Sequence, residues 1–149
     1  MKVIKKNVYY CEFCKKRSLS GGHLKKHEQR CTNNPNRHCG ACGGSVNVSD
    51  IVDGYKKRFE IVEKKTSYEF GEIYFPLVVK WVGNEITMIE IDEDSDNCPF
   101  CKLAIIRQAG LNRYYFDNKF EFNYKEEAAA FMAEKNAAEY RKEYLGEDY

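Results

Sequence analysis

Apolar residues recur at helical spacing in two segments of the chain. In the first segment they are separated by three or four positions: Val48, Val52, Tyr55, Phe59 and Val62. This periodicity predicts an amphipathic helix, with Ser49 as the expected N-cap. In the second segment, residues 126–145, neither Gly nor Pro interrupts the pattern, which predicts a long C-terminal helix. Its stripe of small and aromatic residues consists of Ala130, Ala133, Ala137, Tyr140 and Tyr144.

Shorter elements are bounded by residues that start or stop them. Residues 1–10 predict a lead-in strand, and a helix is expected over residues 21–31 with Ser18 to Ser20 as its capping segment. The Asn-rich segment TNNPNR, residues 32–37, predicts a turn. A further helix is expected after Cys98, with Pro99 in its first turn and Gly110 at its end.

Two hairpins are predicted between these helices. Residues 72–91 are apolar and β-branched around a break at Gly83-Asn84, and Pro76 restricts the first half to an edge strand. An acidic loop, DEDSDN, follows at residues 92–97. A second hairpin is expected in residues 114–124, around Asp117-Asn118. Together these elements predict a small α+β protein with a mixed helix and hairpin body.

The second predicted hairpin is rich in aromatic residues, which leaves two interpretations. Its side chains could form a stacking platform for single-stranded bases, or a core that packs a sheet against the last helix. Basic residues are sparse there, which favours the core. The aromatic residues are Tyr114, Tyr115, Phe116, Phe120, Phe122 and Tyr124.

Composition limits the class of protein. The chain has 149 residues and 43% hydrophobic content, enough for one modest core or two small ones. No run of 18 apolar residues could cross a membrane, and the basic N-terminus lacks the apolar segment of a signal peptide. Seven cysteines, an odd number, fit metal binding in a reducing compartment better than a disulfide framework. We therefore expect an intracellular, cytoplasmic protein.

The net charge of +1 hides a strong asymmetry between the two ends of the chain. Residues 1–42 hold ten Lys and Arg against two Glu, a net +8, whereas residues 43–149 hold fourteen basic and twenty-one acidic groups, a net −7. Such a division suggests a basic, anion-seeking module joined to an acidic body. The predicted boundary separates residues 1–36 from residues 37–149.

The basic module contains five possible metal ligands in 21 residues. Cys11-x2-Cys14 precedes a twelve-residue spacer and His27-x3-Cys31, so two thiolates lie on a turn and two ligands lie one helical turn apart. The fifth candidate is His23. The alternative set of Cys11, Cys14, His23 and His27 would leave Cys31 without a role, which favours Cys31 as the fourth ligand.

A second site is predicted from two further cysteine pairs, Cys39-x2-Cys42 and Cys98-x2-Cys101. Four thiolates form the tetrahedral set of a structural zinc ribbon, although here 55 residues separate the pairs, so that the ion would clamp the whole body. With this assignment all seven cysteines serve two zinc ions. His38 and Cys31 could replace a ligand, but the two cysteine pairs do not require it.

At residues 9–31 the chain resembles the two-cysteine, two-histidine zinc-finger family. It departs from that family in carrying Cys31 in place of the second histidine, and Ser18 in place of an aromatic anchor. The resemblance implies base-facing helix positions at Ser20, His23 and Lys26. With HEQRCTNNPNRHCGAC and the later CPFCKLAIIRQ, the whole chain resembles small zinc proteins of phages and mobile elements, most of them without a described activity.

These observations favour a non-enzymatic regulatory or accessory protein that contacts nucleic acid, DNA rather than RNA. The expected contact residues are Lys15, Lys16, Arg17, Ser20, His23, Lys25, Lys26, Arg30 and Arg37. A protein partner or a homodimer is also expected, and neither a membrane nor a small-molecule substrate is.

Other classes of protein remain open. The chain could be a protein–protein adaptor or inhibitor that uses zinc only structurally. A His-Asn-His-type nuclease is a minor alternative, because no strand carries the expected histidine pair. A thioredoxin-like redox pair at CPFC is another, although an acidic loop and not a strand precedes it.

Overall fold

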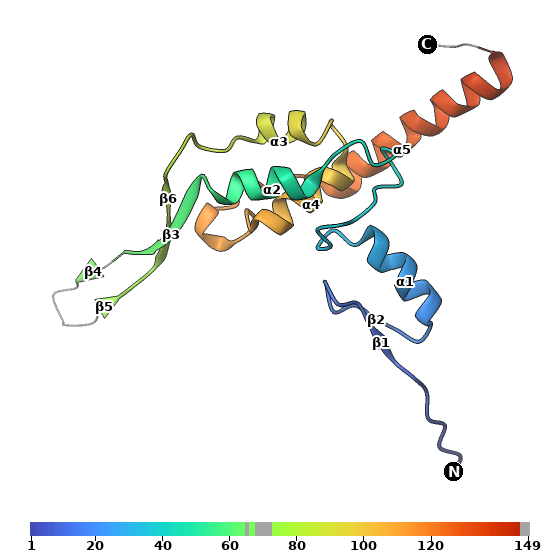
Figure 1. Ribbon diagram of the computed structural model, residues 1–149, viewed down its shortest axis with the longest axis horizontal. Helices are drawn as coiled ribbons and strands as arrows, with labels where there is room; N and C mark the ends of the chain where they lie inside the picture. The colour runs from blue at the N-terminus through green and yellow to red at the C-terminus, as the bar shows by residue number, and fades with distance from the viewer. Residues whose placement is uncertain (65, 68–72, 147–149) are drawn as a thin grey trace.

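The computed structural model describes residues 1–64, 66–67 and 73–146 of this chain. It is a small α+β protein with two short-stranded regions and a long C-terminal helix (Figure 1). We refer to residues 9–31 as the N-terminal module, to residues 32–38 as the linker and to residues 39–146 as the body. In Figure 1 the module lies to one side of the body, and α5 carries the chain away from it at the C-terminal end.

The N-terminal module is a two-stranded hairpin followed by a helix. Strands β1 (Tyr9–Tyr10) and β2 (Arg17–Ser18) pair antiparallel, and α1 (Gly21–Arg30) follows. Ser20 caps α1 by accepting a hydrogen bond from the backbone N–H of His23, as the serine-rich segment before it predicts. The predicted capped helix is confirmed, whereas the lead-in strand predicted for residues 1–10 is confined to Tyr9–Tyr10.

The body is built around two helices that pack against each other in its core. Helix α2 (Val48–Lys56) packs on α4 (Pro99–Ala109), which α3 (Met88–Asp94) and α5 (Tyr124–Tyr140) also contact. Helix α4 is buried along most of its length, because apolar residues occupy nearly all of its faces. Its start at Pro99 and its end at Gly110, which adopts φ 73°, confirm the predicted boundaries.

The predicted helix from residue 48 ends earlier than its periodicity suggests. Asn47, and not Ser49, is the N-cap, and the helix stops at Lys56. Residues Phe59–Glu63 instead form strand β3, which pairs antiparallel with β6 (Leu77–Trp81). Phe59 and Val62 repeat at helical spacing, but pairing with β6 and the contact of Phe59 with Trp81 and Phe116 decide their conformation.

The predicted hairpin around Gly83-Asn84 is therefore wrong in its partner strand. Strand β6 pairs with β3, which precedes it in the sequence, and not with the segment after Gly83. The pairing of β4 (Thr66–Ser67) with β5 (Ile73–Tyr74) continues the register of β3 and β6. These four strands form one arm that leaves the helices in Figure 1. The segment after Gly83 folds as α3, capped by Thr87, and α3 also covers the first half of the predicted acidic loop.

The second predicted hairpin is also wrong. Tyr114–Phe116 form a short 3-10 helix, η1, and no strand is present among the described residues of this segment. Asp117 and Asn118 both adopt positive φ, so the turn itself is where the sequence places it. Phe116 and Phe120 are buried in the core of the body, which confirms a packing role for these two rings without a sheet.

The C-terminal helix is confirmed. Helix α5 runs from Tyr124 to Tyr140 and continues as a π-helical turn, η2 (Arg141–Leu145). Its first half is fixed to α4 by Lys102, a buried ammonium that forms ion pairs with Asp92 at 2.7 Å and Glu127 at 3.0 Å. The Lys102 ammonium also lies 4.3 Å from the centroid of the Phe122 ring.

Candidate metal centres

The N-terminal module brings four of its five possible ligands together. The ligand atoms of Cys11, Cys14, His27 and Cys31 all lie within 4.8 Å of one another. Nε2 of His27 is 3.1 Å from Sγ of Cys14. Cys11 and Cys31 are buried, and the side chain of Leu24 packs against them as the small core of the module. This arrangement is suited to hold one metal ion.

The backbone explains how these ligands converge. After Cys11 the chain turns tightly: the Lys15 N–H donates to the carbonyl of Cys11, and the Cys11 N–H donates to that of Lys16. Lys15 closes the turn with φ 61°. On the other side, α1 presents His27 one turn before Cys31, which is the C-cap of the helix.

His23 lies outside this cluster. It is exposed on the first turn of α1, whereas His27 and Cys31 complete the group of ligand atoms. Of the two ligand sets that the sequence leaves open, the structure forms the one that includes Cys31. The imidazole of His23 is therefore free for another role.

The second cluster joins residues that are far apart in sequence. Sγ of Cys39 lies 3.8 Å from that of Cys98, and Sγ of Cys42 lies 3.6 Å from that of Cys101. A tetrahedral ion with metal–sulfur bonds of about 2.3 Å separates its sulfurs by about 3.8 Å, whereas a disulfide would bring them to about 2.05 Å. All seven cysteines are free, and the spacing fits a tetrahedral metal site.

Two local features present these thiols. Cys39 and Cys42 lie on a turn completed by Gly43 and Gly44, both with positive φ. At Gly44 a Cβ atom would come within 2.8 Å of the His38 ring, so only glycine fits there. His38 is thus packed beside the turn, outside both ligand groups.

The other pair is placed by α4. Cys98 is the N-cap of this helix and Cys101 lies in its first turn, so both thiols leave the same end of the helix. Both residues are fully buried and, with Cys39, belong to the buried core of the body.

Three thiols of the second cluster, those of Cys39, Cys98 and Cys101, shift one another's pKa in opposite directions. Hydrogen bonds from Cys101 and Cys98 stabilise the Cys39 thiolate and lower its pKa, and the same contact raises the pKa of Cys101. At Cys98 a hydrogen bond from Cys101 favours the thiolate, but Cys39 and burial outweigh it and raise the pKa to about 11. In the absence of a cation such a cluster keeps protons that a metal ion must displace.

The first cluster shows the same competition. Burial raises the pKa of Cys31 to about 11. Burial acts in the same sense at Cys11, but hydrogen bonds from the backbone of Cys14 and Phe13 outweigh it, and the pKa of Cys11 is lowered. One thiol of each cluster is thus predisposed to ionise, while another retains its proton.

The linker attaches the module to the body through contacts that the sequence does not predict. The Gln108 side-chain amide on α4 donates to the carbonyl oxygens of Thr32, at 2.8 Å, and Asn34, at 3.1 Å. Arg107 donates to the Thr32 hydroxyl, and Nη1 of Arg37 lies 3.5 Å from Sγ of Cys101. Because these partners are more than 60 residues apart in sequence, no local pattern indicates them.

The predicted nucleic-acid contacts divide into two groups. Eight are exposed on the module: Lys15, Lys16, Arg17, Ser20, His23, Lys25, Lys26 and Arg30. The ninth, Arg37, is half-buried between the linker and the four-cysteine cluster. Lys15 also donates to the carbonyl of Glu12, so its ammonium is partly occupied.

Comparison with known proteins supplies no relative from which a role could be transferred. No family model, curated protein or solved structure matches the chain. Among the described residues no helix combines the length and hydrophobicity needed to cross a lipid bilayer. The two clusters and the surface of the module are therefore the features of the molecule that bear on its function.

Proposed function

We propose that this protein holds two structural zinc ions and contacts nucleic acid, DNA in preference to RNA, through the basic surface of its N-terminal module. Three thiolates with an imidazole, and four thiolates, are both ligand sets that favour zinc in a reducing compartment. Both clusters are also completed by protein side chains alone, as in structural sites, which have no open position for a substrate.

The observation that carries the nucleic-acid proposal is the distribution of ion pairs. All four ion pairs among the described residues lie in the body, where acidic groups are in excess. None of the module's cations has a carboxylate within 4.0 Å in the described part of the chain. Unpaired and exposed cations on one small module form the electrostatic surface that attracts phosphates.

Helical spacing organises part of this surface. His23, Lys26 and Arg30 are separated by three and four positions, so they share one face of α1. The buried Leu24 and the ligands His27 and Cys31 occupy a neighbouring face that points toward the cluster. The metal site thus fixes which side of the helix remains available to a ligand.

The proposed role is non-enzymatic. Of the three histidines in the chain, His27 belongs to a ligand cluster, and His23 and His38 are exposed at separate positions. A nuclease centre needs several such groups around one open metal position. A small module contributes limited contact area, so a partner protein or a second copy would supply further affinity.

Binding to a fluorescent DNA duplex, measured by anisotropy over a range of salt concentrations, tests the proposal. Phosphate contacts predict a steep loss of affinity as salt rises. Replacement of Lys25 and Lys26 by Glu is expected to weaken binding at least tenfold. The same replacement at Lys56 and Lys57, an equally exposed pair in the body, provides the matched control and is expected to have little effect.

Two outcomes would contradict the proposal. If the two double replacements weaken DNA binding equally, the module is not the site of contact with DNA. Absence of salt-dependent binding by the wild-type protein would favour the alternative role, a protein–protein adaptor in which zinc is only structural.

A further inference from the structure

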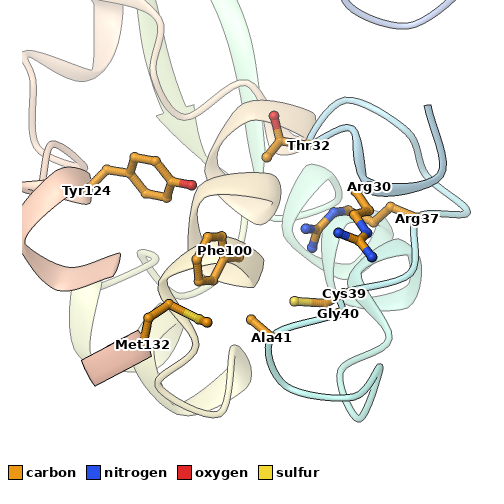
Figure 2. A pocket seen from close by; sticks show the side chains of 9 residues that line it. All are labelled: Arg30, Thr32, Arg37, Cys39, Gly40, Ala41, Phe100, Tyr124 and Met132. Carbon is orange, nitrogen blue, oxygen red and sulfur yellow. The ribbon is translucent and has the colours of Figure 1, made fainter. Parts of the chain in front are cut away.

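A cavity of about 400 Å³ lies where the module, the linker and the body meet (Figure 2). This volume is within the range of cavities that bind small molecules. Residues from α1, the linker, the turn at residues 39–42, α4 and α5 line it: Arg30, Thr32, Arg37, Cys39, Gly40, Ala41, Phe100, Tyr124 and Met132. The cavity does not belong to either metal cluster, although Cys39 forms part of its wall.

One end of the cavity is cationic. Figure 2 shows the guanidinium groups of Arg30 and Arg37 on the same side of it. Neither has a carboxylate within 4.0 Å among the described residues. Arg37 uses Nη1 on the Cys101 sulfur, but its buried Nε has no hydrogen-bond partner in the part of the chain that the structure describes.

The guanidinium of Arg30 has a different environment. It lies against Gly40, within 3.6 to 3.8 Å of the position that a Cβ atom would occupy. Nothing among the described residues accepts a hydrogen bond from it, so its donors are available to a ligand. The position of Arg37, which contacts sulfur, can be explained by its charge neutralising the thiolates. The position of Arg30 at the cavity is not explained in this way.

The opposite end is aromatic and apolar. Phe100 and Tyr124 meet edge to face with ring centroids 5.9 Å apart, and Met132 lies beside them. All three side chains are half-buried, so they keep surface toward the cavity. A cationic end and an aromatic end in one cavity match a ligand that has an anionic group and a flat ring.

We propose that this cavity binds one nucleotide with an unpaired base. The phosphate lies on Arg30 and Arg37, whose guanidinium groups suit its oxygens, and the base packs on Phe100 and Tyr124. The source of the nucleotide rests on the proposed function: a strand held by the basic module would deliver it, whereas a free mononucleotide would present the same chemistry. Base pairing would prevent entry, so the cavity selects single-stranded ends or loops.

The test compares a 12-nucleotide single strand, a duplex of the same sequence and adenosine 5′-monophosphate. Tyr124→Ala is expected to weaken single-strand binding about tenfold and to leave duplex binding within about twofold. Arg30→Gln should weaken binding of both the single strand and the mononucleotide. Tyr140→Ala, on the exposed end of α5, and Arg113→Gln, an exposed arginine of the body, are the matched controls.

Metal content and thermal melting verify that each variant is folded. If Tyr124→Ala is unstable, binding of adenosine 5′-monophosphate to Arg30→Gln carries the test, because Arg30 also belongs to the basic surface of the module and only the mononucleotide isolates its role in the cavity.

The nucleotide cavity would be overturned if Tyr124→Ala and Arg30→Gln weaken single-strand binding no more than their control variants do. The proposed function would then remain intact. If the wild-type protein binds neither strand nor duplex, the proposed function fails and the mononucleotide decides the cavity. Saturable binding of adenosine 5′-monophosphate that is lost in Arg30→Gln would support a cavity for free nucleotides. No mononucleotide binding in that case would overturn the cavity as well.

Discussion

The two metal clusters have similar ligands but very different positions in the chain. The first takes all its ligands from residues 11–31, on one hairpin and one helix. The second joins a turn at residues 39–42 to the start of α4, so that α2, the hairpin arm and α3 lie within the loop that it closes. The first cluster organises a local unit, whereas the second constrains the topology of the whole body.

This difference predicts where metal loss acts. The module has a core of only three buried residues, so we expect its fold to depend on a bound ion. The body has a larger buried core, but the second cluster fixes the start of α4, the helix on which that core is built. Loss of the first ion should therefore unfold one unit, and loss of the second should loosen everything packed on α4.

The largest effect is expected from Cys98→Ser. This change leaves three ligands in the second cluster and should lower the free energy of unfolding of the body by several kcal/mol, because structural zinc supplies on the order of 10 kcal/mol. Thermal melting followed by near-UV circular dichroism would report the loss. Cys31→Ser is the matched control, since it should abolish metal binding in the module and spare the melting of the body. An unchanged melting temperature of the body in Cys98→Ser would contradict a stabilising role for the second cluster.

Acidification should release both ions. The raised pKa values of Cys31 and Cys98, each about 11, mean that these thiols are protonated in the metal-free protein at neutral pH. Metal binding must displace these protons, so affinity should fall about tenfold per pH unit for each proton released.

The metal-free fold should respond in the opposite direction. In the body, the thiol of Cys98, whose pKa is raised from 9.0 to about 11, stabilises the metal-free fold below pH 9, and this contribution is lost as the pH rises through 11. Titration with a chromogenic chelator and melting of the metal-free protein across this range would measure the two trends. Metal affinity that does not change with pH would show that the thiols are not the ligands.

Lys102→Met tests how far the body is held by contacts other than the metal. The change removes the buried ammonium from Asp92 and Glu127, which are partly exposed, so we expect a loss of about 1–2 kcal/mol in denaturant unfolding. Lys119→Met, which breaks an exposed ion pair with Glu85, should change stability by less than about 0.5 kcal/mol. A Lys102→Met loss as large as that of Cys98→Ser would weaken the central role of the second cluster.

A local effect, no larger than that of Lys102→Met, is expected from Gln108→Ala. It removes two hydrogen bonds to the carbonyl oxygens of the linker and should cost about 1 kcal/mol. The metal content of both clusters should stay the same, while amide hydrogen exchange in residues 32–38 should become faster. Loss of an ion from the module would show that the two regions are less independent than their cluster geometry implies.

The same contrast explains what the sequence could predict. Local signals located the module, the boundaries of α4 and the long α5, because caps, Pro99, Gly110 and ligand spacing act within a few residues. The cysteine pairs were matched across 55 residues only because thiols seldom remain unused once a metal can bind them.

The failures lie where distant pairing decides the conformation. Phe59 and Val62 fit a helix by spacing, but strand β6 is available to pair with them. Ile89 and Ile91 fit a strand by composition, but Thr87 starts a helix there. The cavity was also beyond local analysis, since its walls combine residues 30–41 with Phe100 of α4 and with Tyr124 and Met132 of α5.

Metal content per chain, measured by elemental analysis, tests the central claim most directly. The two-centre account predicts two zinc ions in the wild-type protein, two in His23→Ala and one in Cys31→Ser. One ion or none in the wild type, iron in place of zinc, or loss of an ion from His23→Ala would contradict it.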